Sequence, residues 1–172
     1  MPTIGVAVAI PEPWARDLQH YRLSVGDVTA TQIPTHITLI PPVEVGVEDL
    51  EAIEDHLRDA AGCVGPFEVH LRGTGSFRPV SPVVFVTLAE GISACEQLAD
   101  AVRQGPLAIE LAFPYHPHVT IAHHLPDDVL DLAFDDLAGF ECVFEATAFH
   151  LYLHDDNEGW RPTREFRLVG TG

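Results

Sequence analysis

The sequence predicts an α+β protein with two similar lobes related by a pseudo-twofold axis. Two observations support this fold class: apolar residues alternate between strand-like and helix-like spacing, and one order of elements occurs twice. That order is strand, helix, His-x-Thr strand, helix, strand. No Ser/Gly-rich linker separates the two copies. We therefore expect a single compact domain over residues 1–172, made of repeat lobes at about 1–79 and 80–172.

The first copy contains three predicted strands and two predicted helices. Apolar and β-branched residues dominate TIGVAVAI, which is typical of a strand, whereas apolar residues recur at helical spacing in VEDLEAIEDHLRDAA. The alternating segment FEVHLRGTGSF closes the copy. The predicted elements are a strand at 3–10, a helix at 13–23, a strand around His36, a helix at 47–61 and a strand at 67–77.

The second copy follows the same order. Pro126 and the two aspartates after it indicate the start of a helix, and the Phe-Glu pair that opens the last strand of the first copy recurs. A final strand, REFRLVG, has no clear counterpart in the first copy. The predicted elements are a strand at 82–89, a helix at 92–102, a strand around His118, a helix at 126–140 and a closing strand or hairpin partner at 140–154.

The composition narrows the classes of function. A formal net charge of −17 argues against a broad basic surface for long nucleic acid, although a local pocket with a few arginines is compatible with it. All nine basic residues are arginines, which excludes mechanisms that need a lysine, such as a P-loop or a Schiff base. Three widely spaced cysteines suit reduced thiols, and neither a signal peptide nor a bilayer-spanning run is evident. We expect a cytoplasmic protein that does not associate with membranes.

The two His-x-Thr motifs are the strongest indication of function. Side chains two positions apart on a strand point to the same face, so His36 projects with Thr38, and His118 projects with Thr120. A single motif of this kind is weak evidence, because most such residues are structural. Two copies at equivalent places in an internal repeat favour a shared site across a cleft.

Such a site suits metal-free acid–base chemistry at phosphorus. One neutral histidine can take a proton from an attacking hydroxyl or water, while the other, protonated, gives a proton to the leaving oxygen. The two threonine hydroxyls can hold the oxygens of a phosphate group between them. Which histidine is the acid and which is the base stays open.

The histidines are also compatible with two other interpretations. His116, His118, His123 and His124 together suggest zinc, but Pro117 interrupts them and no cysteine or acidic ligand lies at the usual spacing. The segment HPHVT also resembles the motif of the histidine-triad nucleotide hydrolases, whose third alternating position is a histidine and not a threonine. We therefore predict neither a metal nor another cofactor.

At these residues the chain resembles the 2H phosphoesterases, which include the LigT-like 2′-5′ RNA ligases and cyclic nucleotide phosphodiesterases. The resemblance rests on THITLI and HPHVTIA, and GTGSF and GWRPTREFRL look like strand ends of that family. It implies two antiparallel sheets flanking a central cleft, with helices outside. It also implies that His36 and His118 are the acid–base pair and that Thr38 and Thr120 bind phosphate.

One position departs from the family pattern. Many LigT-like members have an arginine three positions after the second threonine, where this chain has His123. A titratable group in place of a fixed cation argues against polynucleotide ligation. The candidate substrate contacts are His123, Arg72, Arg78 and Arg161, with Phe77, Tyr115 or Trp160 as a surface on which a base could stack.

The predicted function is a phosphoesterase reaction on a 2′,3′- or 1″,2″-cyclic phosphate or a 2′-5′ linkage, with reverse ligation sharing the same transition state. We expect a small nucleotide or an RNA end as the substrate, no long nucleic acid tract, and a monomer. The alternative is a non-catalytic module of the same fold that binds a nucleotide or a phosphorylated metabolite. An assay on 2′,3′-cyclic nucleotides with a chelator present separates the two.

Overall fold

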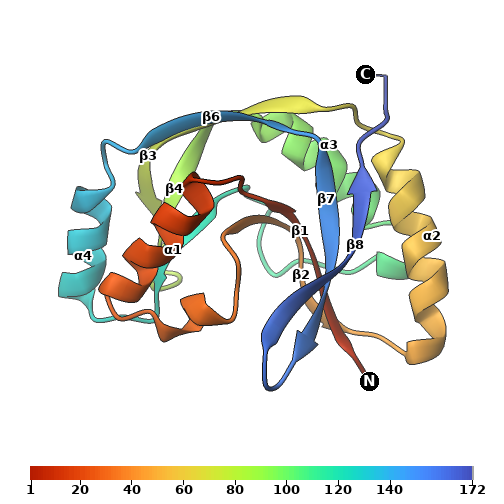
Figure 1. The fold of residues 1–172 in the computed structure, drawn as a ribbon, viewed down its shortest axis with the longest axis horizontal. Helices are drawn as coiled ribbons and strands as arrows, with labels where there is room; N and C mark the ends of the chain where they lie inside the picture. Colours follow the sequence, from red (N-terminus) through yellow and green to blue (C-terminus); the bar gives the residue numbers. More distant parts are fainter. Residues whose placement is uncertain (172) are drawn as a thin grey trace.

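Two four-stranded antiparallel sheets form the centre of the protein in a computed structural model that describes residues 1–171 (Figure 1). This is the α+β class that the sequence predicts. The elements are β1 Thr3–Ala9, α1 Trp14–Ser24, β2 His36–Glu44, α2 Leu50–Ala61, β3 Phe67–Ser76, β4 Val83–Glu90, α3 Ile92–Val102, β5 Val119–His123, α4 Asp127–Asp136, β6 Glu141–Ala146, β7 Ala148–Asp155 and β8 Gly159–Arg167.

The two sheets do not follow the two halves of the chain. The first sheet, sheet A, has the order β2-β1-β7-β8, and the second, sheet B, has the order β5-β4-β3-β6. Strand β3 of the first half therefore lies between β4 and β6 of the second half, whereas β7 pairs with β1. The predicted lobe boundary near residue 79 thus does not describe the sheets, because each copy gives its closing strand to the other sheet.

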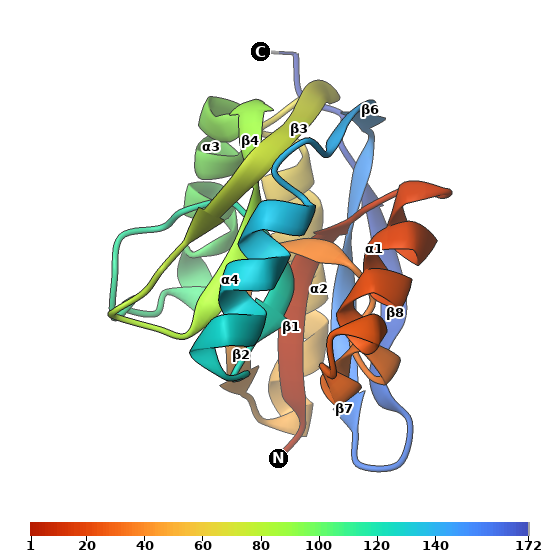
Figure 2. The same cartoon turned by 90° about the vertical axis from the view of Figure 1, so that its left-hand side faces the viewer.

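The helices cross over in the same way. Helix α1 follows β1 of sheet A but packs against β5 of sheet B, and α3 follows β4 of sheet B but packs against β2 of sheet A. Helix α4 also lies on sheet B, and α2 packs against α3 and β8 (Figures 1 and 2). Each sheet is therefore covered by one helix from each half.

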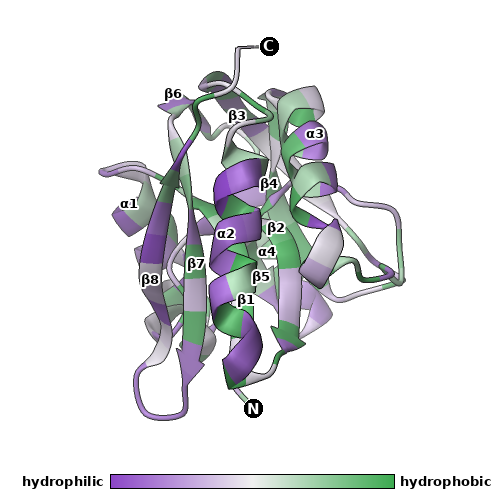
Figure 3. Cartoon of the chain, turned by 90° about the vertical axis from the view of Figure 1, so that its right-hand side faces the viewer, coloured by the Kyte–Doolittle hydropathy of each residue, from purple (hydrophilic) through white to green (hydrophobic). Residues whose placement is uncertain are grey.

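Apolar periodicity places the core between these layers. In α2 the side chains of Ile53 and Leu57 are 1% and 0% exposed, as their helical spacing predicts. Figure 3 shows the opposite, outward face of α2 as mainly hydrophilic. Cys95 and Cys142 are buried, Cys63 is exposed, and all three are free thiols.

Two segments near the C-terminus differ from their predicted form. Residues 140–154 contain two strands, β6 and β7, which belong to different sheets. The final strand begins at Gly159, earlier than predicted, because β8 forms a hairpin with β7. No helix within residues 1–171 has both the length and the apolar character that a bilayer span requires.

Candidate active site

The first His-x-Thr motif lies at the start of β2, at the centre of a pocket between the two sheets. Ile37 and Leu39 are fully buried, whereas His36 and Thr38 are half-buried and line the pocket. The predicted alternation is therefore present, and it turns both polar side chains toward the pocket.

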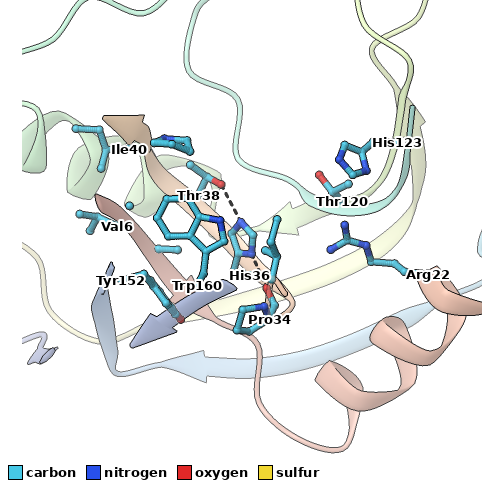
Figure 4. Close-up of a pocket in the computed structure, with 14 residues that line it drawn as sticks. Val6, Arg22, Pro34, His36, Thr38, Ile40, Thr120, His123, Tyr152 and Trp160 are labelled. Carbon is cyan, nitrogen blue, oxygen red and sulfur yellow. Dashed lines mark hydrogen bonds between the residues drawn. The ribbon is translucent and has the colours of Figure 1, made fainter. Parts of the chain in front are cut away.

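Hydrogen bonds fix the ring of His36. Its Nδ1 donates to the carbonyl oxygen of Pro34 at 2.6 Å, and its Nε2 lies 3.1 Å from Thr38 Oγ1 (Figure 4). Since a carbonyl oxygen can only accept, Nδ1 carries the proton in the neutral ring, and Nε2 is left as the basic nitrogen. The Thr38 hydroxyl can donate to that nitrogen.

The Nδ1 hydrogen bond recurs in the second motif, where β5 begins. Val119 and Ile121 are fully buried, and His118 Nδ1 donates to the carbonyl oxygen of His116 at 2.7 Å. Each histidine therefore donates from Nδ1 to the carbonyl two residues before it, and each exposes the same nitrogen. The ring of Phe77 meets the His118 ring edge to face, with 4.8 Å between centroids.

Both histidines are easier to deprotonate than a free imidazole. Burial is the main cause that lowers the pKa of His36, and the charge of Arg22 adds to it. Burial also lowers the pKa of His118, with further contributions from the charges of His116 and His36. His118 is not among the residues that line the pocket, although Thr120 of the same motif is.

The pocket has a volume of about 220 Å³ and two chemically different ends. Figure 4 shows Arg22, Thr120 and His123 on one side of His36, and Trp160, Tyr152 and Val6 on the other. The first end offers hydrogen-bond donors and positive charge, and the second offers an apolar wall. The remaining lining residues are Gly5, Ala7, Ile33, Pro34, Thr38, Ile40 and Pro42.

Trp160 forms the wall of the apolar end. Its backbone N–H donates to the carbonyl of Gln32 at 2.8 Å, which ties β8 to the loop before β2. The indole lies over Gly5 of β1, where a Cβ atom would approach it to 3.4 Å. A glycine at this position therefore lets the indole lie close to the strand, where it offers a flat surface to a ligand.

Of the other candidate contacts, His123 and Trp160 line the pocket, whereas five do not: Arg72, Phe77, Arg78, Tyr115 and Arg161. Arg78 is turned toward α4, where it pairs with Asp131 at 2.9 Å. Arg161 pairs with Glu158 on the surface. The Tyr115 hydroxyl donates to the carbonyl of Thr38 at 2.7 Å, so this side chain supports the first motif and does not face the pocket.

Arg22 and Asp27, to which the sequence pattern assigns no role, lie behind the positive end of the pocket. Both residues are 3% exposed, and they form an ion pair at 2.8 Å. His123 Nδ1 lies 3.1 Å from the same carboxylate. The available signal was an arginine in the core-facing row of α1, four positions after the buried Leu18.

No group of three or more His, Cys, Asp or Glu side chains is arranged to hold a metal ion within residues 1–171. The two histidines on β5 and directly before it point instead to different partners. His118 bonds a backbone carbonyl and His123 bonds Asp27. The pocket lining supplies the imidazoles of His36 and His123, the guanidinium of Arg22, and the hydroxyls of Thr38, Thr120 and Tyr152.

Comparison with known proteins identifies the class as a 2H phosphoesterase. The model of the 2′-5′ RNA ligase superfamily matches residues 10–158, and the chain belongs to this superfamily. A Bacillus cytotoxicus protein provisionally named a phosphoesterase is 33% identical over 138 residues, which cover 79% of this chain and 80% of that protein. A Bacillus licheniformis protein with a similar name is 28% identical over 163 residues, covering 94% and 96%.

Solved structures share the fold. The structure of TT0787 from Thermus thermophilus covers 100% of both chains with a TM-score of 0.70 at 22% identity. The structure of E. coli LigT in complex with 3′-AMP covers 98% of this chain and 99% of that one, with a TM-score of 0.65 at 20% identity. The predicted LigT-like arrangement of two antiparallel sheets with helices outside is therefore confirmed.

Proposed function

We propose that this phosphoesterase acts without a metal on cyclic phosphodiesters of ribonucleotides or RNA ends, or on 2′-5′ linkages, by general acid–base catalysis from His36 and His118. The observation that carries the proposal is their shared geometry. Each ring donates from Nδ1 to a carbonyl, at 2.6 Å and 2.7 Å, which leaves Nε2 as the basic nitrogen of both rings, and Nε2 of His36 lies 3.1 Å from Thr38 Oγ1. Reverse ligation would use the same two groups.

The proton transfers follow from this geometry. One histidine takes a proton from water as the water oxygen attacks phosphorus, and the other gives a proton to the ribose oxygen as the P–O bond breaks. The lowered pKa values favour a neutral ring in the free enzyme. An anionic phosphate between the rings favours protonation of the one that acts as the acid.

The two ends of the pocket support a nucleotide as the substrate. The phosphate would lie toward Thr120 and Arg22, and the base would lie toward Trp160, where an aromatic surface can stack on it. The pocket is small, and the chain carries a net charge of −17, which disfavours a long anionic polymer.

Hydrolysis of the four 2′,3′-cyclic mononucleotides, followed with and without EDTA, tests the proposal. Wild type should turn over at least one of them at a rate that EDTA does not change, because the chain supplies both the acid and the base. His36→Ala and His118→Ala should each lower kcat by about 10²–10⁴-fold. The double variant should be little worse than the less active single variant, since the two groups act as a unit. Near-normal turnover in either single variant would refute the mechanism.

A further inference from the structure

Arg22 is a charged side chain in a core-facing position of α1. Trp14, Leu18 and Arg22 follow one another at intervals of four residues, so all three lie on the face that packs toward sheet B. Arg22 is 3% exposed, and the part of it that remains accessible lines the pocket. A buried guanidinium is costly unless it is paired, so its contacts indicate what holds it there.

Asp27 holds one edge of this guanidinium. Arg22 donates to Asp27 Oδ2 from Nε at 3.0 Å and from Nη2 at 2.8 Å. Gly26, with φ of +95°, ends α1 in a sharp turn that brings Asp27 back beside Arg22. The other carboxylate oxygen, Oδ1, accepts from the backbone N–H and the hydroxyl of Thr29. Both carboxylate oxygens of Asp27 therefore accept hydrogen bonds, one from Arg22 and the other from Thr29.

The opposite edge of the guanidinium is free to bind. Within residues 1–171, Arg22 Nη1 has no hydrogen-bond partner, and it is not among the buried polar atoms that lack one, so it remains open to the pocket. Figure 4 shows the guanidinium extending toward Thr120 and His36. The two N–H groups of Nη1 are therefore available to an acceptor inside the pocket.

The surroundings favour an anionic acceptor. The chain has 26 acidic residues, yet no aspartate or glutamate lines the pocket within the part of the chain that the structure describes. Beside Arg22 the lining offers the Thr120 hydroxyl and the His123 ring, whose Nδ1 is held by Asp27. A guanidinium, a hydroxyl and an imidazole together suit phosphate oxygens.

Arg103 provides an internal comparison. It directly follows α3, the helix that packs on sheet A as α1 packs on sheet B. Its Nη2 pairs with Asp100 at 2.7 Å, its guanidinium carbon lies 6.0 Å from the centre of the Tyr115 ring, and it does not line the pocket. Of the arginines within residues 1–171, Arg22 is the one that lines the pocket.

We propose that Arg22 binds the phosphate group of the substrate through Nη1, with Asp27 as the positioning residue that fixes the guanidinium. This role of Arg22 refines the proposed function. It rests on the proposed function for the reaction, whereas the binding of phosphate can be tested without it. The positively charged group near His123 is then Arg22, which α1 supplies, and not an arginine on β5. Arg22 and Thr120 bind the anion together, from two elements that the crossing of α1 brings side by side.

Binding of inorganic phosphate, followed by NMR, tests the proposal without a nucleobase or turnover. In wild type labelled with ¹⁵N, the Nε–H signal of Arg22 should shift as phosphate is added at constant ionic strength. The signal of Arg164, which pairs with Glu54 outside the pocket, should not shift. An unchanged Arg22 signal, or no binding of phosphate to wild type, would overturn the proposal. This measurement needs no substitution and is therefore independent of any folding defect.

Substitution gives a second measurement. Removing Arg22 alone would leave Asp27 as a buried, unpaired charge, so the variant to use is the double change Arg22→Gln with Asp27→Asn. It should weaken phosphate binding by about 10- to 100-fold, as the loss of a charged hydrogen bond implies. Arg16→Gln with Asp17→Asn removes the same two charges from the exposed face of α1 and should leave binding unchanged. Equal affinity in the two double variants would refute the role of Arg22.

The two proposals fail separately. A wild-type protein that binds phosphate through Arg22 but opens no cyclic phosphate would refute the proposed reaction and support the phosphate site. Suppose instead that wild type opens cyclic phosphates but the Arg22/Asp27 double variant binds phosphate as tightly as wild type. That result would support the proposed reaction and refute the phosphate site.

Discussion

Tyr115→Phe tests whether the two motifs are held at a fixed spacing. Tyr115 lies three positions before His118, and its hydroxyl donates at 2.7 Å to the carbonyl of Thr38. This bond joins the segment that leads into β5 to the backbone of β2. Removing a half-buried neutral hydrogen bond costs about 1 kcal/mol, which corresponds to a fall in Tm of about 2–4 °C for a chain of this size. Thermal denaturation measures this loss.

The same change should reduce turnover. If all of that energy serves to position Thr38 in the transition state, kcat falls by at most about fivefold. Tyr21→Phe is the matched control: it removes a hydroxyl that donates to Asp136 at 2.8 Å between α1 and α4, and neither residue lines the pocket. The control should keep wild-type turnover. A Tyr115→Phe variant with unchanged Tm and unchanged kcat would show that this bond does not set the spacing.

Three further predictions concern the pocket. Thr38→Val and Thr120→Val should each lower kcat/KM by about 3- to 10-fold, because each removes one neutral hydrogen bond to phosphate. This loss is smaller than the loss expected for His36→Ala or His118→Ala. A threonine variant as inactive as a histidine variant would contradict this prediction. Trp160→Ala should raise KM for a cyclic nucleotide by about 5- to 100-fold through lost stacking, and an unchanged KM would place the base elsewhere. In denaturant titrations, stability should fall as pH drops below about 6.5, because the unfolded chain then binds more protons than the folded His36 and His118 do. A variant with both His36→Asn and His118→Asn should lose less stability over that range. If its free energy of unfolding fell with pH as steeply as that of wild type, the assignment would be contradicted.

The sequence predicted the local structure well because local periodicity determines it. The buried Ile37 and Leu39 and the pocket-facing His36 and Thr38 follow from the two-residue repeat of a strand. The same reasoning identified α2 from apolar residues at helical spacing. These parts of the fold needed no knowledge of distant contacts.

Pairing between distant segments was beyond the sequence pattern. Nothing local in β3 indicates that it inserts between β4 and β6, because register and partner depend on the whole sheet. Arg78 was expected to contact a ligand, but its guanidinium pairs with Asp131 on α4. Arg22 lies in a row of core-facing residues, and its position at the pocket depends on α1 crossing to the other sheet.

The exchange of closing strands has a consequence for how the protein is made. The strand β1, which leaves the ribosome before the other seven, lies between β2 and β7, and its residue Ile4 pairs with Leu153. During synthesis, the paired strands β1 and β2 must therefore keep an open edge and an exposed apolar face until β7 and β8 have been added. Sheet B can complete its strand order once β6 has emerged, whereas sheet A, and with it the Trp160 wall of the pocket, is finished last. The newly synthesised chain thus completes its pocket only when its last hairpin has joined the sheet.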